Sequence, residues 1–256
     1  MNKQTRRNFL KTSLYAGTTV AWTAKSWAQV KGANETLRCA TIGFRGRGNS
    51  HIGSIKGMQQ REQGVKLTAL CDVDKKVLEA GASKHKVAGY QDIRVMLEKE
   101  ELDVVTVATP NHWHSLAAIW AVQAGKDVYV EKPVSHNVWE GRQLVNAARK
   151  YKKIVQTGTQ ARSSKCIQDA VQWVQAGNLG KIKVSRGLCY KRRDSIGDIP
   201  NTKDVPREVD YDLWLGPAPK KPLARERLHY DWHWMWDYGN GDLGNQGIHQ
   251  MDIARW

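Results

Sequence analysis

The sequence predicts an α/β fold with a doubly wound parallel sheet. Short apolar runs rich in β-branched residues recur along residues 34–157, and segments with helical periodicity separate them. We expect strands at 37–42, 65–71, 104–108, 128–130 and 154–157. The clearest helical segment is "HSLAAIWAVQAGK", which Gly125 ends. Strands that alternate with helices pair in parallel through right-handed crossovers.

The first 28 residues predict a twin-arginine signal peptide rather than part of the fold. "TRRNFLK" (5–11) precedes the weakly apolar stretch 14–24, and Ser26-Trp27-Ala28 suits a signal peptidase. The alternative is an ordinary basic amphipathic start. We therefore expect export by the twin-arginine machinery to the periplasm and a mature chain that begins near residue 29.

Composition indicates a soluble domain that recognises no nucleic acid. The 256 residues are 41% apolar, which suffices for a core, while the mean hydropathy of −0.59 argues against a membrane-spanning helix. Loss of the basic leader lowers the net charge from +15 to +10. The remaining Lys and Arg are scattered among acids, and this pattern fits a solvated surface or attraction to an anionic cofactor.

The four cysteines predict neither a metal site nor a disulfide. Cys39, Cys71, Cys166 and Cys189 lie far apart and form no CxxC pair. Cys39 and Cys71 fall within apolar strands, so we expect them to be buried thiols.

A glycine-rich turn follows the first predicted strand. Glycines allow a tight turn and let backbone N–H groups approach a pyrophosphate, so "IGFRGRG" predicts a dinucleotide site. Its candidate cofactor-binding residues are Gly43, Phe44, Arg45, Gly46, Arg47 and Gly48. Arg45 stands where the usual fingerprint has glycine, and its side chain could either crowd the phosphates or contact them.

Asp72 supports the same site, because it ends the second predicted strand at the distance from Gly48 where an acid accepts hydrogen bonds from the adenosine ribose. A carboxylate there favours NAD over NADP, although Arg45 or Arg47 could offset this preference. The alternative is a surface turn whose Asp caps the next helix.

The next two strand ends carry further candidates, since ligands bind at the carboxyl ends of parallel strands. In "VATPNHWHS", Pro110 ends a strand, Asn111 or His112 could cap the following helix, and His114 lies in its first turn. We expect cofactor contacts from Thr109, Pro110, Asn111 and His114.

The strand 128–130 ends in Glu131-Lys132-Pro133. A lysine in a partly dry pocket or near other cations has a lowered pKa and moves protons near neutral pH. The alternative is a lysine that extends to water. We count Glu131 and Lys132 among the cofactor contacts.

The motifs "IGFRGRG", "CDVD", "ATPNHWH", "AGKDVYVEKP", "DYDLWLGPAP" and "GNGDLGNQGIHQMD" resemble the glucose-fructose oxidoreductase, inositol dehydrogenase and MocA (Gfo/Idh/MocA) family over residues 37–256. The resemblance implies a Rossmann-type NAD-binding domain (34–157) and an exported branch of the family. It also implies an α+β substrate domain (158–256) with an open, mostly antiparallel sheet, incomplete here because the sequence is C-terminally truncated. We expect "KIKVSRGLCY" (181–190) to be one of its strands.

The resemblance also implies the catalytic residues. Lys132 would lie beside the nicotinamide and take part in proton transfer. The family pairs an Asp with a His four residues later, and here Asn245 and His249 have that spacing. Gln160 and Arg162 match a position that faces the substrate cleft. We therefore predict Lys132 and His249 as catalytic and Gln160, Arg162, Asn245 and His249 as substrate-binding.

Asn245 departs from the family acid. An amide can orient an imidazole without stabilising its protonated form. Asp242 or Asp252 could supply the missing charge. The spacing of Trp232, Trp234 and Trp236 by two predicts one face of a strand, which would serve either core packing or as a platform for sugar rings.

The expected activity is an oxidoreductase with tightly bound NAD, or NADP, that transfers a hydride between the nicotinamide and a sugar or polyol hydroxyl. Two alternatives remain open: an NAD-dependent glycoside hydrolase that oxidises the sugar transiently, and a sugar-binding protein without catalysis. We expect a small-molecule substrate and a homo-oligomer.

Overall fold

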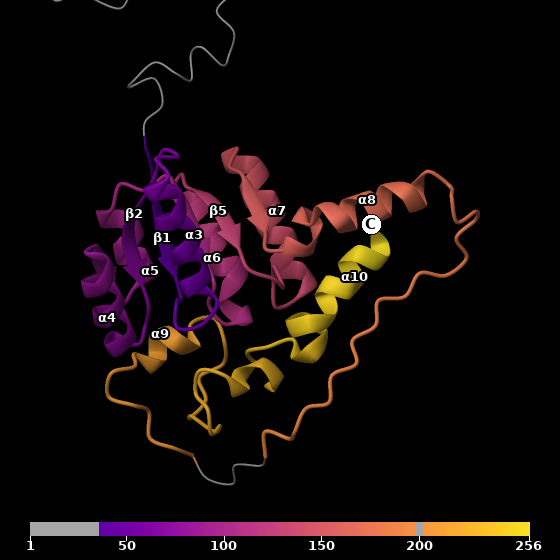
Figure 1. Cartoon of the computed structure of the whole chain (residues 1–256). Coiled ribbons are helices and arrows are strands. Elements are labelled where there is room, and N and C mark those ends of the chain that lie inside the picture. Colours follow the sequence, from indigo (N-terminus) through magenta and orange to yellow (C-terminus); the bar gives the residue numbers. More distant parts are fainter. Residues whose placement is uncertain (1–35, 198–201) are drawn as a thin grey trace, which may run out of the picture. The chain divides into compact units, whose positions relative to one another are not determined.

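The computed structural model describes residues 36–197 and 202–256. The predicted signal peptide lies outside these residues. The described chain contains a six-stranded parallel sheet with the order β3-β2-β1-β4-β5-β6 (Figure 1). Its strands are β1 (Leu37–Ile42), β2 (Val65–Cys71), β3 (Ala88–Tyr90), β4 (Val104–Val107), β5 (Asp127–Val130) and β6 (Val155–Thr157). This is the strand order of dinucleotide-binding folds, so the predicted doubly wound sheet is confirmed.

Helices cover both faces of the sheet. They are α3 (Gly48–Gln60), α4 (Lys75–His85), α5 (Ile93–Lys99), α6 (Asn111–Gln123) and α7 (Val138–Tyr151). Apolar side chains of α3 and α4 form one buried cluster with the sheet, and those of α5, α6 and α7 form a second. Burial on both faces explains why the strands read as continuous apolar runs rather than alternating ones.

The predicted strands agree with the structure at five of the six positions in the sheet, with ends that differ by one residue at most. The sequence analysis missed β3. This three-residue strand contains Gly89, carries no apolar run, and is held by parallel pairing with β2, for example Ala69 with Ala88. Pairing with a long buried neighbour therefore formed this strand despite its weak local signal.

After β6 the described chain is mainly helix and irregular structure. Its elements are η1 (Gln160–Ser163), α8 (Lys165–Gln175), α9 (Tyr211–Leu215), η2 (Asp231–Trp234), the π-helical turn η3 (Leu243–Gly247) and α10 (Ile248–Arg255). None of the described residues beyond Thr157 belongs to a strand of a sheet.

The strand predicted at 181–190 is therefore wrong for this structure. The segment runs without regular structure, and its apolar side chains Ile182 and Val184 are exposed (Figure 1). A strand needs a neighbour to pair its backbone N–H and C=O groups, and no described segment pairs with this one.

The predicted tryptophan stripe is wrong as well. Trp232 lies in the 3-10 helix η2 and is buried, whereas Trp236 is 93% exposed. The three indoles therefore do not share one face of a strand. Trp232 stacks on His233 with ring centroids 3.7 Å apart.

Residues 205–238, which we term the docking segment, pack against the carboxyl ends of β2 and β4. The Asp210 N–H donates to the Val73 carbonyl at 3.1 Å, and the His112 N–H donates to the Tyr238 carbonyl at 3.2 Å. Trp214 is buried, its indole stacks on the Tyr211 ring, and the guanidinium of Arg225 lies 4.0 Å from the indole. This aromatic cluster stabilises a wall at the ligand-binding edge of the sheet.

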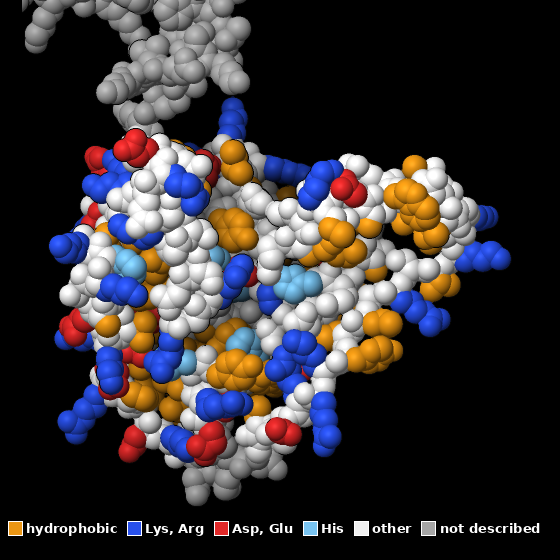
Figure 2. All heavy atoms as spheres, viewed as in Figure 1, with side chains coloured by type: hydrophobic (Ala, Val, Ile, Leu, Met, Phe, Trp, Pro, Cys, Tyr) orange, Lys and Arg blue, Asp and Glu red, His pale blue; other side chains and the backbone are white. Residues whose placement is uncertain are grey.

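Surface features agree with the composition. Lys and Arg side chains are spread over the face shown in Figure 2 rather than gathered into one band. Cys39 and Cys71 are buried, as predicted, and the four cysteines are free. Across the described ranges, every helix is too short or too polar to cross a membrane.

Candidate active site

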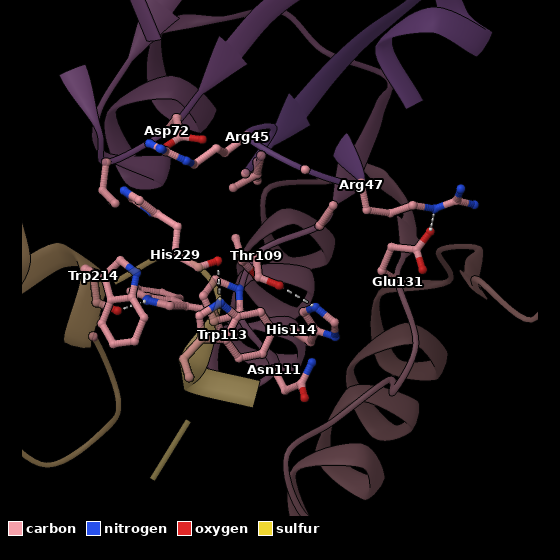
Figure 3. A pocket seen from close by; sticks show the side chains of 18 of the residues that line it. Arg45, Arg47, Asp72, Thr109, Asn111, Trp113, His114, Glu131, Trp214 and His229 are labelled. Carbon is pink, nitrogen blue, oxygen red and sulfur yellow. Dashed lines mark hydrogen bonds and ion pairs between the residues drawn. The ribbon is translucent and has the colours of Figure 1, made fainter. Parts of the chain in front are cut away.

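A cavity of about 770 Å³ opens at the carboxyl ends of β1, β2, β4 and β5 (Figure 3). The docking segment and the start of α10 complete its lining. Most of the predicted site residues line it: Gly43, Phe44, Arg45, Gly46, Arg47, Asp72, Thr109, Pro110, Asn111, His114, Glu131, Lys132, Gln160, Asn245 and His249. Gly48 and Arg162 do not.

The glycine turn between β1 and α3 is too closely packed for larger residues at two positions. Gly43 has φ +73°, and a Cβ there would lie 3.0 Å from the backbone of Ala108. A Cβ on Gly48 would lie 2.1 Å from the Gly43 carbonyl oxygen. No side chain caps the N-terminus of α3, so its first N–H groups and its dipole favour an anion. The turn therefore fits the pyrophosphate of a dinucleotide.

Arg45 leaves this turn open. Its guanidinium Nη1 pairs with Asp74 Oδ2 at 3.0 Å, which draws the side chain toward the end of β2 (Figure 3). Asp72 accepts the N–H of Phe44 at 3.0 Å, and burial raises the pKa of its carboxyl group. Asp72 thus ties the turn to β2 and still lines the cavity.

The start of α6 joins two strand ends. Asn111 does not cap the helix, as we expected it or His112 to do, because Pro110 takes the cap position and Asn111 Oδ1 accepts the N–H of Asn240. The buried His114 ring lies with Nε2 2.8 Å from the carbonyl oxygen of Thr109 and Nδ1 2.5 Å from that of Pro133. Burial lowers the pKa of His114. Its role is to connect the end of β4 to the Glu131-Lys132-Pro133 sequence.

Glu131 is a buried anion beside the lysine. Burial opposes its ionisation, but hydrogen bonds from His51 Nε2 at 2.9 Å and Arg47 Nε at 2.8 Å lower its pKa to about 2. The Arg47 side chain thereby points from the glycine turn toward Glu131 (Figure 3), and its charge acts on Lys132.

Among residues 36–197 and 202–256, no carboxylate is hydrogen-bonded to the ammonium group of Lys132. Its Nζ donates to the main-chain carbonyl of Asn245. Burial, together with the positive charges of Arg47 and Lys191, lowers the pKa of Lys132, and Glu131 opposes this shift. A half-buried lysine with a lowered pKa can take up and release a proton near neutral pH.

His249 lines the same cavity from α10. Burial and the charge of Lys132 lower its pKa. The two predicted catalytic groups therefore lie close enough for the charge of Lys132 to disfavour protonation of His249.

The two aspartates that could have compensated for Asn245 have other partners. Asp252 accepts two hydrogen bonds from Arg162, at 2.7 and 2.8 Å, and Asp242 accepts two from Arg193. This pairing places Arg162 against α10 rather than at the cavity where we predicted it. His249 thus has a lysine nearby, and neither of these two aspartates is hydrogen-bonded to it.

The sequence analysis missed the residues that the docking segment supplies. They include Leu213, Trp214 and Pro217, and Trp113 of α6 also lines the cavity. The indole N–H of Trp113 donates to the Trp214 carbonyl at 3.0 Å. The signal was present in "DYDLWLGPAP", a motif that the sequence analysis noted without assigning it to the site.

Within residues 36–197 and 202–256, no group of three or more His, Cys, Asp or Glu side chains is arranged to hold a metal ion.

Several proteins of known identity are similar to this chain. A "Glycosyl hydrolase family 109 protein" of Solibacter usitatus is 34% identical over 166 residues, which cover 58% of this chain and 37% of that protein. A "Glycosyl hydrolase family 109 protein 1" of Shewanella sp. strain ANA-3 is 31% identical over 129 residues, 46% of this chain and 27% of that protein. The chain thus spans well under half the length of these relatives.

Solved structures show the same similarity. Myo-inositol 2-dehydrogenase from Lactobacillus plantarum has a TM-score of 0.52 and 28% identity, over 58% of this chain and 43% of that one. The WlbA dehydrogenase from Bordetella pertussis, crystallised with NADH and UDP-GlcNAcA, has a TM-score of 0.53 and 25% identity, over 57% of this chain and 44% of that one.

Two family models together match most of the chain. "Oxidoreductase family, NAD-binding Rossmann fold" matches residues 37–159, and "Oxidoreductase family, C-terminal alpha/beta domain" matches residues 163–256. Both models describe domains of one family, and the observed strand order and glycine turn agree with the first. The chain belongs to the Gfo/Idh/MocA oxidoreductase family and carries its NAD-binding Rossmann domain.

Proposed function

We propose that this chain belongs to an exported, NAD-dependent oxidoreductase that transfers a hydride between the cofactor and a hydroxyl-bearing carbon of a sugar or polyol. One observation carries the proposal. Lys132, at the end of β5, and His249, in α10, line one cavity with the glycine turn and Asp72. The candidate proton-transferring groups and the candidate dinucleotide site therefore share one cavity.

The residues of the cavity fit the cofactor. The backbone of the turn 43–47 and the N-terminus of α3 would hold the pyrophosphate, and Asp72 would accept hydrogen bonds from the adenosine ribose. Lys132 lines the same cavity, near enough to Glu131 and Arg47 for their charges to act on its ammonium group. When bound, NAD supplies the site for hydride transfer.

Lys132 and His249 would exchange the hydroxyl proton of the substrate. Burial lowers the pKa of both groups, and the charge of Lys132 further disfavours protonation of His249. Both shifts favour the neutral forms, which can accept a proton. The Asn245 carbonyl holds the lysine ammonium in place. Gln160 and the Asn245 side chain are the neutral groups that would bind further hydroxyls of the substrate.

A second candidate function is NAD-dependent glycoside hydrolysis, which the names of the two curated relatives favour. Transient oxidation acidifies the proton on the neighbouring carbon, and loss of that proton expels the leaving group. The chain would then need its proton-transferring groups twice in one cycle. Lys132 and His249 supply two such groups in one cavity.

The two candidates are separated by their products. The purified protein is assayed for co-purified NAD, then incubated in parallel with free sugars plus NAD and with aryl glycosides. Net NADH formed with a free sugar supports the oxidoreductase, and aglycone release without net NADH supports the hydrolase. Sugar binding with neither product, unchanged in Lys132→Ala, would support a non-catalytic binding protein and overturn both.

A further inference from the structure

Two aspartates at the end of β2 have different positions relative to the cavity. Asp72 lines it, and its two carboxylate oxygens accept the N–H groups of Phe44 and Asp74, both at 3.0 Å. Asp74 lies behind the cavity lining and is 3% exposed. Asp72 can therefore meet a ligand directly, whereas Asp74 acts only through its neighbours.

Asp74 holds two residues that do line the cavity. Its Oδ2 atom lies 3.0 Å from Arg45 Nη1 and 3.2 Å from His229 Nε2. Its Oδ1 atom accepts the Val77 N–H at 3.2 Å and caps α4. Arg45 comes from the glycine turn and His229 from the docking segment, so one buried carboxylate joins two sides of the adenosine end.

The charges at this end leave one anion uncompensated. Arg45 is paired with Asp74, and burial together with the charge of Arg45 lowers the pKa of His229 and favours its neutral form. Asp72 keeps a carboxylate with no cation hydrogen-bonded to it within the described chain. A carboxylate at this position suits a ribose diol and repels a ribose phosphate.

The Arg45 side chain could otherwise bind such a phosphate. It is 54% exposed and lines the cavity beside Asp72. A guanidinium near the second strand is the group with which dinucleotide-binding folds accommodate the 2′-phosphate of NADP. The charge of Asp74 therefore determines whether that guanidinium is available.

We propose that Asp74 sets the preference of this site for NAD over NADP by holding Arg45 in an ion pair at the adenosine end. Asp74 is thus a positioning residue that selects the cofactor without touching it. This inference rests on the proposed NAD site and goes beyond it by naming the residue that excludes the phosphorylated cofactor.

The test measures the dissociation constants for NAD⁺ and NADP⁺ by titration calorimetry, with no substrate or turnover required. Asp74→Asn removes the charge and keeps an oxygen that can cap α4, because Asn and Asp are similar N-caps. We expect the NADP⁺/NAD⁺ affinity ratio to rise about tenfold or more, the scale of one charge-assisted contact to phosphate. Adding Arg45→Met to this variant should remove the gain.

Asp92→Asn is the matched control. Asp92 also caps a helix, α5, pairs with an arginine that lines the cavity, Arg94, and lines the cavity itself. The Asp92→Asn substitution should change the NADP⁺/NAD⁺ affinity ratio less than threefold, because Arg94 lies outside the glycine turn. If Asp74→Asn does not fold, as judged by its thermal transition, Asp74→Ser provides another capping side chain without charge.

Three outcomes would overturn the inference. In the first, the NADP⁺/NAD⁺ affinity ratio of Asp74→Asn stays within twofold of the parent value. In the second, the ratio remains raised after Arg45→Met is added to Asp74→Asn. In the third, Asp92→Asn raises the ratio as much as Asp74→Asn does. Failure of the parent protein to bind either dinucleotide would overturn the proposed function and the inference with it.

Discussion

The ammonium group of Lys132 donates a hydrogen bond to the main-chain carbonyl of Asn245. This contact joins the end of β5 to the π-helical turn η3, which leads directly into the helix of His249. A main-chain acceptor holds the lysine whatever side chain stands at position 245. The lysine is thus placed without a carboxylate, and its pKa stays below the ordinary value.

Asn245→Asp should move the pH dependence of activity upward. A carboxylate at this cavity position stabilises the protonated forms of Lys132 and His249, so both pKa values rise. The reaction needs a deprotonated base, and the acidic limb of the kcat/KM profile should shift by about one pH unit to higher pH. Asn178→Asp, at an exposed site, is the control. An unshifted limb would show that residue 245 does not face the titrating pair.

Lys132→Met should abolish proton transfer and leave cofactor binding nearly intact. Loss of a positioned acid–base group costs about 10²- to 10⁴-fold in kcat. NAD affinity should change less than activity, because the turn and Asp72 remain. Single-turnover rates and NAD titrations measure the two effects separately. Lys66→Met, at an exposed position in β2, should affect neither, and a lysine variant with full activity would exclude Lys132 as the acid–base group.

Gly48→Ala and Gly46→Ala form a matched pair in the glycine turn. The new Cβ at 48 would lie 2.1 Å from the Gly43 oxygen, whereas the Cβ at 46 meets nothing within 4 Å. We expect Gly48→Ala to lower the free energy of unfolding by about 1–3 kcal/mol or more. Gly46→Ala should stay within about 0.5 kcal/mol of the parent protein. Chemical denaturation of both variants checks this, and equal losses would contradict the packing described for the turn.

Gly216→Ala should weaken cofactor retention. Gly216 has φ +49°, and a Cβ there would lie 2.1 Å from the Trp113 ring, so the substitution must displace the cavity lining near Trp214. We expect NAD to dissociate about tenfold faster, which corresponds to about 1.4 kcal/mol. Gly125→Ala is the control, because Gly125 has φ +79° but faces open space at the end of α6. Stopped-flow displacement of NAD measures the dissociation rate of each variant. The rate for Gly216→Ala should exceed that of the parent protein, whereas the rate for Gly125→Ala should equal it.

Glu131→Gln should be less stable than the parent protein at neutral pH. The folded-state pKa of Glu131, about 2, lies below its ordinary value of 4.5, so its ionised form stabilises the fold above pH 4.5. That contribution, on the order of 3 kcal/mol, is lost as the pH falls from 4.5 toward 2. Unfolding measured from pH 7 to 3 should show the two proteins converging in acid. Exposed Glu98→Gln should show no such convergence.

The sheet was predictable because its strands are buried on both faces. Long apolar runs such as Leu37–Ile42 and Val65–Cys71 leave little ambiguity, and the glycine turn and Asp72 follow them directly. The three-residue β3 was not predictable, since pairing with β2 rather than composition forms it.

The second half of the site was less predictable. Lys132, Asn245 and His249 could be placed together only through a family resemblance, because their contact spans distant parts of the chain. The strand expected at 181–190 from the family resemblance was wrong here, because strand formation depends on a partner that the local sequence does not specify. The partner of Arg162 could not be predicted for the same reason. Asp252 is distant from Arg162 in the chain and contacts it because α10 packs against η1.

The docking segment has a thermodynamic consequence. Its residues and the sheet enclose the adenosine end of one cavity from two sides, so a dinucleotide bound there would contact both. Binding of NAD would then stabilise the docking segment and the sheet together. At saturating NAD the two regions would melt in one transition at a higher temperature. A substitution in residues 205–238 that weakens NAD binding, and leaves the stability of the NAD-free protein unchanged, would accordingly behave in a melting experiment like a lower cofactor concentration.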